Sequence, residues 1–207
     1  MKVITIVLLL TALCGCATKK QIPTPTFEEE VIRLRSLDMK HFRDTASIHD
    51  DPLELTAMIT TSKSHSQYWP PSSPMQTDPF IRVYIDKKTQ AKLFQVYMRI
   101  NHYSGEWLFP YQANYGRPLR SSKVTRIDSD VDCGRRTCRY REDIAFNVEE
   151  EELRRMLTLS DEDIATKYWA FKLKTKSGKD ILEGFNVNEI LGLLDVVDKY
   201  KTIQTLE

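Results

Sequence analysis

In the stretch IRVYIDKKTQAKLFQVYMRI, residues 81–100, apolar and polar side chains alternate on both sides of a short polar segment. A period of two residues places every second side chain on the same face and is typical of a half-buried β-strand. Residues 86–89 are few and polar enough to form a hairpin turn. The stretch therefore predicts two antiparallel strands that bury one common face, formed by Ile81, Val83, Ile85, Phe94, Val96, Met98 and Ile100.

The same alternation recurs on both sides of this hairpin. It predicts extended segments over residues 53–59, 118–132, 138–148, 169–173 and 181–185. We expect residues 118–132 to pair with residues 138–148. Glu142 interrupts the apolar face of the latter segment. Because an unpaired buried carboxylate is costly, we expect Glu142 at the rim of a sheet or paired with an arginine.

Helix signals lie near both ends of the chain. Thr26 and Glu29 have the spacing of a capping box for a helix to about Leu37. Asn147 and Asn186 are placed to begin a short helix to about residue 157 and a C-terminal helix. Residues 41–52 and 62–79 are expected to be connections. The pattern predicts a mainly β (α+β) fold, an antiparallel β-sandwich or open barrel with short N-terminal and C-terminal helices.

The first sixteen residues have the order of an export signal. Lys2 supplies a positive charge, an apolar run continues to Leu13, and the small residue Gly15 precedes Cys16. The run is too short for a permanent membrane span, so we expect a signal peptide that is removed.

Leu13-Cys-Gly-Cys16 resembles the lipobox of bacterial lipoproteins, which reads Leu-x-Gly-Cys. The resemblance implies cleavage before Cys16 and lipidation of that cysteine. It also implies sorting to the outer membrane, facing the periplasm, because Ala17 and not Asp follows the cysteine. An ordinary signal peptide is the alternative. The expected organisation is a signal peptide over 1–15, a lipidated tether over 16–26 and one globular domain over 27–207.

The charge of the chain is balanced. It holds 30 basic and 29 acidic residues, and loss of Lys2 with the signal peptide leaves 29 of each. A balanced charge provides no net attraction for nucleic acid or an anionic membrane surface. We therefore expect no nucleic-acid partner, and attachment to the membrane through the N-terminal lipid.

Cys133 and Cys138 are the cysteines that remain after lipidation. Export places them in an oxidising compartment, where a disulfide is the default. The four residues between them can form a hairpin loop that opposes the two cysteines at its base. A zinc site needs more ligands, and a redox pair usually has Cys-x-x-Cys spacing. The spacing predicts a structural disulfide.

The sequence contains no catalytic motif or cofactor fingerprint. Its histidines, at positions 41, 49, 65 and 102, have no metal-ligand spacing. Asp128-Ser-Asp-Val-Asp132 resembles the start of a calcium loop, but Cys133 and Arg139 stand where an EF-hand needs Gly and Glu. We expect no catalysis, metal or cofactor. The alternative is an envelope hydrolase whose site is assembled from distant segments.

Aromatic clusters are the best candidates for partner binding. Trp69 lies in a predicted loop, and Trp107 and Tyr111 lie in or beside another. Exposed aromatic rings supply binding area at low entropic cost, although loop aromatics can also fold back as anchors on the core. The sequence predicts a lipid-anchored, periplasm-facing binding or scaffolding module for an envelope protein or glycan. A lipoprotein that mainly maintains the envelope is a third hypothesis.

Overall fold

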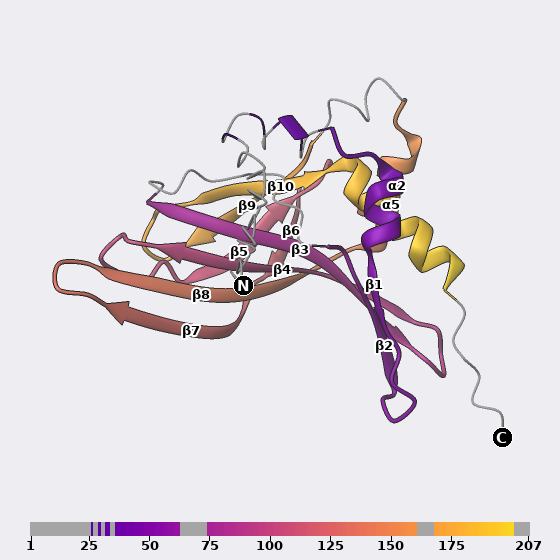
Figure 1. Cartoon of the computed structure of the whole chain (residues 1–207), viewed down its shortest axis with the longest axis horizontal. Coiled ribbons are helices and arrows are strands. Elements are labelled where there is room, and N and C mark those ends of the chain that lie inside the picture. Colours follow the sequence, from indigo (N-terminus) through magenta and orange to yellow (C-terminus); the bar gives the residue numbers. More distant parts are fainter. Residues whose placement is uncertain are drawn as a thin grey trace, which may run out of the picture.

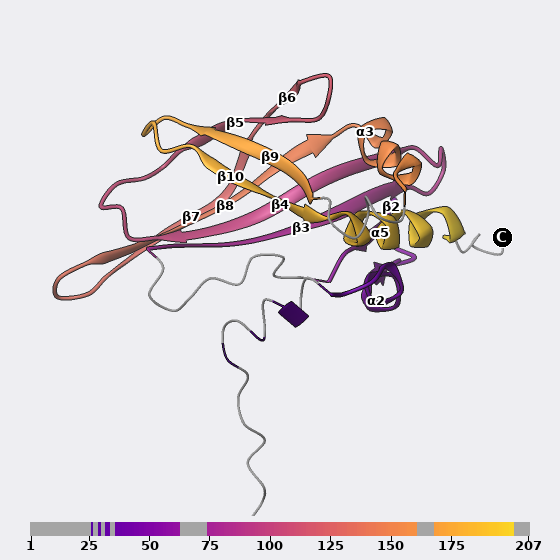
Figure 2. The ribbon, with the colours of Figure 1, turned by 90° about the horizontal axis from the view of Figure 1, so that it is seen from above.

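Two antiparallel β-sheets pack face to face, and helices lie against one end of the pair (Figures 1 and 2). The structure is a computed structural model that describes Thr26, Glu29, Ile32, Arg33 and residues 36–62, 74–160 and 168–200. The described strands form two separate sheets and not a closed barrel. This arrangement confirms the predicted mainly β, α+β fold in its sandwich form.

The larger sheet has six strands in the order β1-β2-β3-β4-β8-β7. Their bounds are β1 Ser47–His49, β2 Thr56–Thr60, β3 Met75–Asp86, β4 Lys92–His102, β7 Thr125–Cys133 and β8 Cys138–Val148. The smaller sheet has the order β10-β9-β5-β6. Its strands are β5 Pro110–Tyr115, β6 Arg120–Lys123, β9 Tyr168–Thr175 and β10 Ile181–Asn186.

The β3–β4 hairpin confirms the prediction from residues 81–100. Val83 pairs with Phe94, and all seven apolar residues of the predicted face are buried. The Asp86 carboxylate accepts hydrogen bonds from the backbone N–H groups of Lys88 and Thr89 and closes the turn. The buried face of the larger sheet, to which this hairpin belongs, meets the buried face of the smaller sheet, and Phe146 of β8 there contacts Phe171 of β9 with ring centroids 5.0 Å apart.

The helical segments are α2 Met39–Thr45, α3 Glu150–Arg154 with the following 3₁₀ turn η1 Arg155–Thr158, and α5 Val187–Lys199. Asn186 caps α5 as predicted, because its side chain accepts a hydrogen bond from the N–H of Asn188. Helix α2 lies directly on α5 at Gly192. A Cβ atom at this position would lie 2.7 Å from the Cβ of Phe42, so only glycine permits the contact.

Three predictions near the N-terminal end are corrected. Residues 41–52 are not an irregular connection, because they contain most of α2 and all of β1. The strand predicted over 53–59 begins only at Thr56, and Leu53 and Leu55 are exposed. The loop predicted over 62–79 is shorter, because β3 begins at Met75. By contrast, the capping box is confirmed, since Thr26 and Glu29 exchange the expected hydrogen bonds.

Two further predictions are corrected in the middle of the chain. Residues 118–132 do not form one strand against 138–148, because β6 pairs with β5 and only β7 pairs with β8. The chain passes from the smaller to the larger sheet at the buried Val124. Asn147 lies in β8 and does not cap a helix, and the N-cap of α3 is Glu149.

The predicted signal peptide, the lipidation site Cys16, almost all of the tether and Trp69 lie outside the described residues. None of the helices in the described part of the chain has the length and apolar character to cross a bilayer.

Candidate functional site

Aromatic and basic side chains meet where the loop after β4 enters β5. Contacts join Trp107, Phe109, Arg126 and Lys176, and Tyr111 follows Phe109 by two residues at the start of β5; these five residues are called the aromatic surface below. The guanidinium carbon of Arg126 lies 4.6 Å from the ring centroid of Trp107 and 4.9 Å from that of Phe109. Lys176 Nζ lies 6.0 Å from the Phe109 centroid. Cations at such distances from ring faces are attracted to them.

Two rings of this surface remain accessible. Phe109 is 39% exposed and Tyr111 is 44% exposed. Trp107 is half-buried, because its ring packs edge-on against Tyr140 of β8 at 5.0 Å. Trp107 thus partly anchors the loop on the core, as the alternative hypothesis expects. Phe109 and Tyr111 are more exposed to solvent. Tyr111 lies beside the loop, in strand β5.

A buried carboxylate holds the loop beneath these rings. Glu142 of β8 has no exposed surface, and its Oε1 and Oε2 accept hydrogen bonds from the backbone N–H groups of Leu108 at 2.7 Å and Phe109 at 3.1 Å. Burial raises the pKa of Glu142, but the hydrogen bonds that it accepts and the charge of Arg126 together lower it below the ordinary value. Glu142 is fully buried, and its side-chain partner at 3.3 Å is His102, while Arg126 acts only through its charge. The expectation of a rim position or of a direct pair with an arginine is therefore wrong.

The backbone of Phe109 is strained. Its φ angle is +51°, in the left-handed region that bulky residues rarely occupy. This conformation costs about 1–2 kcal/mol for a residue with a Cβ atom. The hydrogen bond to Glu142 fixes the backbone N–H of Phe109, and the Phe109 carbonyl accepts a second bond from the N–H of Lys176 at 3.1 Å. The strained residue is thus fixed on both sides with its ring at the surface.

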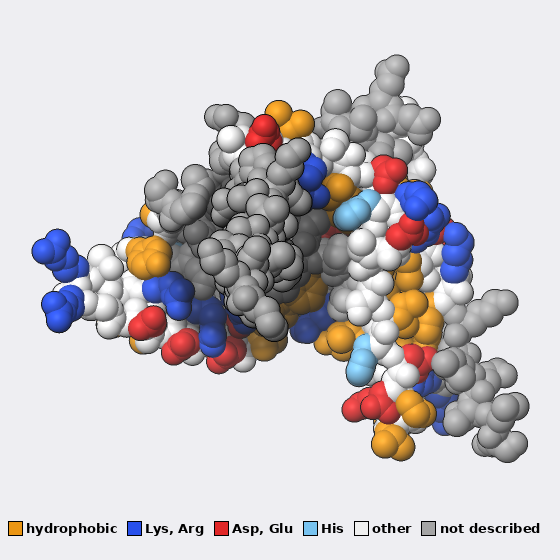
Figure 3. All heavy atoms as spheres, viewed as in Figure 1, with side chains coloured by type: hydrophobic (Ala, Val, Ile, Leu, Met, Phe, Trp, Pro, Cys, Tyr) orange, Lys and Arg blue, Asp and Glu red, His pale blue; other side chains and the backbone are white. Residues whose placement is uncertain are grey.

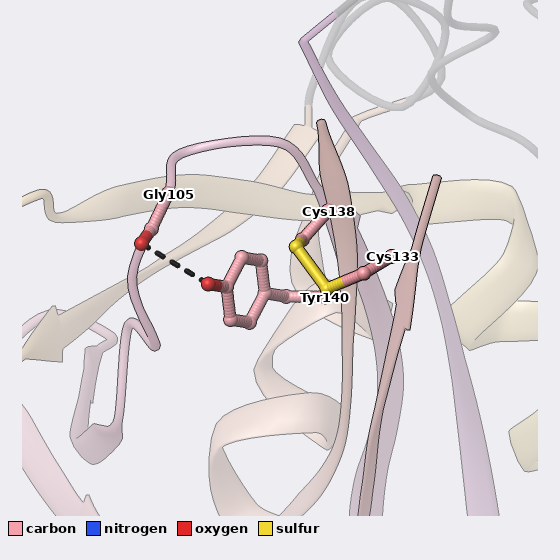
Figure 4. The surroundings of a disulfide bond; sticks show 4 residues. All are labelled: Gly105, Cys133, Cys138 and Tyr140. Carbon is pink, nitrogen blue, oxygen red and sulfur yellow. Dashed lines mark hydrogen bonds between the residues drawn. A yellow bond between two sulfur atoms is a disulfide. The ribbon is translucent and has the colours of Figure 1, made fainter. Parts of the chain in front are cut away.

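The loop is also fastened to the base of a projecting hairpin. Strands β7 and β8 extend beyond the body of the sheet and end at the loop of residues 134–137, whose basic side chains appear at the left of Figure 3. Cys133 and Cys138 form the predicted disulfide at the end of the strands, with Cα atoms 4.0 Å apart. Two residues further along β8, the hydroxyl of Tyr140 donates to the carbonyl of Gly105 at 3.1 Å (Figure 4).

Ser104, His102 and Glu142 form a chain of contacts that resembles a hydrolase triad. Ser104 Oγ lies 2.7 Å from His102 Nδ1, and His102 Nε2 lies 3.3 Å from Glu142 Oε1. The arrangement nevertheless fits a structural role better. His102 is 1% exposed, and Ser104 Oγ also lies 2.8 Å from the carbonyl of Glu106. The neighbouring N–H groups of Leu108 and Phe109 already bind Glu142 and cannot stabilise an oxyanion.

The remaining sequence candidates lie elsewhere. Asp128 and Asp132 belong to strand β7, where Arg141 pairs with Asp128 at 2.8 Å and Arg139 with Asp132 at 3.7 Å. Across the described ranges, no three His, Cys, Asp or Glu side chains gather closely enough to hold a metal ion. Asp128 and Asp132 therefore form ion pairs with the neighbouring strand.

Sequence reasoning identified the aromatic cluster from Trp107 to Tyr111, which includes Phe109, but it missed the left-handed backbone of Phe109, the buried His102 and the role of Glu142 as the loop anchor. Among these features, only Glu142 was indicated by the sequence, because it is a charged residue on the apolar face of a predicted strand. Comparison with protein-family models, with curated proteins and with solved structures finds no match to the chain.

Proposed function

We propose that the chain is a lipid-anchored lipoprotein of the bacterial outer membrane that faces the periplasm and binds another envelope component. It has a non-catalytic role in this proposal, and the aromatic surface is its contact site. The lipobox residues up to Cys16 support the anchor. The strained backbone of Phe109, fixed by Glu142, supports the contact site, because strain of this kind is concentrated at functional positions.

The favoured partner is an envelope protein with acidic residues around an apolar contact. Tyr, Trp and Arg are the residue types that dominate the energetics of protein interfaces, and all three occur in the aromatic surface. Arg126 and Lys176 beside the rings favour a negatively charged rim on the partner. A glycan partner, on whose sugar rings Phe109 and Tyr111 would stack, is the other outcome that the experiment distinguishes.

The contact site is tested by crosslinking in intact cells from a photoreactive amino acid at Tyr111, with mass spectrometry of the adducts. The matched control carries it at Ile48, a residue of similar exposure on the distant strand β1. We expect one adduct protein from position 111 that is absent from position 48. Cosedimentation with isolated cell-wall glycan in place of a protein adduct would indicate the glycan, and identical adducts at both positions would contradict the proposed site.

The variant Phe109→Gly separates binding from folding. Glycine relieves the left-handed strain while it removes the ring, so we expect the free energy of unfolding to change by less than about 1 kcal/mol. Binding of the captured partner should weaken about tenfold or more, since a lost interface aromatic costs about 2 kcal/mol. Unchanged affinity with unchanged stability would remove Phe109 from the site.

The anchor is tested separately by Cys16→Ser. The variant should accumulate as an unprocessed precursor or be released from the membrane fraction. Mature, membrane-bound protein in this variant would contradict lipidation at Cys16. The hydrolase hypothesis is tested by labelling with a fluorophosphonate probe. We expect no labelling, and a label that Ser104→Ala abolishes would favour a hydrolase.

A further inference from the structure

A cavity of about 400 Å³ lies at the opposite ends of β5 and β9 from the aromatic surface. It is lined by the turn after β5, by the α3–η1 segment and by the first residues of β9 and α5. Much of its wall is apolar, with Met156, Leu159 and Val187 among the lining residues. A volume of this size suits a small molecule.

Glu152 is the buried polar group of this cavity. Its side chain is 1% exposed, and its Oε1 accepts hydrogen bonds from Trp169 Nε1 at 3.2 Å and Arg155 Nη2 at 2.6 Å. Gly116 makes room for the carboxylate, because a Cβ atom there would lie 2.8 Å from its Cδ atom. Within the described residues, Oε2 receives no hydrogen bond. It lies on the side of Gly116, which lines the cavity, and it retains the capacity to accept a hydrogen bond.

Two arginines also line the cavity. Arg117 is exposed and makes no hydrogen bond or ion pair with any residue in the described part of the chain. Arg155 uses one nitrogen for Glu152, and its side chain remains 42% exposed. The cavity wall therefore carries the positive charges of Arg117 and Arg155 and the negative charge of Glu152. This net positive charge suits an anionic group of a ligand that binds next to Glu152.

We propose that this cavity binds a small zwitterion with an apolar side chain, of the class of the aliphatic α-amino acids. Its ammonium group donates to Glu152 Oε2, and its carboxylate binds Arg117 and Arg155. Its side chain packs against Met156 and Val187. Each of the three parts of such a ligand thus has a partner of the matching chemistry on the cavity wall. The site is separate from the aromatic surface, and the proposal does not depend on the proposed envelope partner.

The test is calorimetric titration of the full chain in lipid nanodiscs, since free detergent would compete for an apolar cavity. The probes are L-leucine, N-acetyl-L-leucine without the ammonium group, and L-leucinamide without the carboxylate. We expect saturable binding of L-leucine and binding about tenfold weaker, or none, for each derivative. No binding of L-leucine, or equal binding of either derivative, would overturn the proposal.

Arg117→Ala is the decisive variant, because this exposed side chain supports nothing in the described structure. It should weaken L-leucine binding about tenfold and leave the weak binding of L-leucinamide unchanged. Arg139→Ala, which removes an exposed arginine from the distant β7–β8 hairpin, is the matched control and should bind as the wild type. Equal affinity of Arg117→Ala and Arg139→Ala for L-leucine would refute the assignment of the carboxylate site.

Discussion

Glu183 is a buried carboxyl group whose replacement by glutamine should change how stability depends on pH. It lies on β10 between Ile181 and Phe185 and faces the interior of the sandwich. Its Oε1 accepts a hydrogen bond from the hydroxyl of Thr77 on β3 at 2.5 Å, whereas Oε2 is buried without a hydrogen-bond partner. Burial raises the pKa of Glu183 to about 7, although Thr77 and the backbone of Gly184 act in the opposite direction.

The sign and size of the effect follow from linkage. In the unfolded chain the carboxyl loses its proton near its ordinary pKa of 4.5, while in the folded protein it keeps the proton until about pH 7. The folded state therefore binds more protons between these values, and stability falls as pH rises through this window. The difference between the two pKa values corresponds to a loss of about 3 kcal/mol, complete above pH 7.

Glu183→Gln removes this dependence because an amide does not ionise. We expect the variant to match the wild type in stability near pH 4.5 and to exceed it by about 3 kcal/mol near pH 8. Urea unfolding in a mild detergent, followed by tryptophan fluorescence from the buried Trp169, measures the difference at each pH. Glu54→Gln, at an exposed carboxylate, should keep the wild-type slope. If Glu183→Gln also keeps that slope, the reasoning about this buried group is wrong.

Three further variants test the contacts that shape the molecule, each measured by urea unfolding. Glu142→Ala leaves the buried N–H of Leu108 without a partner and should destabilise the fold by about 3 kcal/mol, whereas the exposed Glu106→Ala should cost less than about 1 kcal/mol. The double variant Cys133→Ser with Cys138→Ser opens a short loop and should cost about 2 kcal/mol. Gly192→Ala introduces a Cβ atom 2.8 Å from the Met39 carbonyl oxygen and should cost about 1–3 kcal/mol.

The fold was predictable where one face of a strand is buried and the other is polar. This condition holds along β3, β4 and β9, where burial alternates residue by residue. It fails in β1, whose residues are all exposed, and in α2, whose one buried residue is Phe42. β1 and α2 form because they pair with or pack on neighbouring elements. Such contacts leave no periodic pattern of apolar residues in the sequence.

The passage from β6 to β7 was not predictable for a different reason. Both strands are extended and mostly polar, so the sequence reads as one long strand. Their partners are different strands in different sheets, since Ser122 pairs with Ala113 and Asp130 pairs with Arg141. Alternation identifies an extended backbone but not the sheet to which it belongs.

For the candidate site, the sequence predicted which aromatic side chains are present, but not the backbone conformation or the strand that fixes them. Trp107 and Tyr111 stand out by residue type, but the left-handed backbone of Phe109 has no signal in the sequence, because Gly or Asn usually occupies that conformation. Glu142 is 33 residues beyond Phe109 in the chain, and its partners are backbone groups that every residue possesses. The strand that anchors the loop therefore could not be identified from the loop.

Glu142 and Glu183 show how the same residue type serves opposite purposes inside one sandwich. Both side chains have no exposed surface. Burial acts to raise the pKa of Glu142, but the hydrogen bonds from His102 and from two backbone N–H groups outweigh it and lower that pKa. The stabilising contribution of Glu142 is therefore present above its ordinary value of 4.5 and is lost as pH falls. Glu183 has one side-chain donor, and its pKa rises to about 7. The supply of donors, and not burial alone, therefore decides which of the two buried carboxyl groups stays charged.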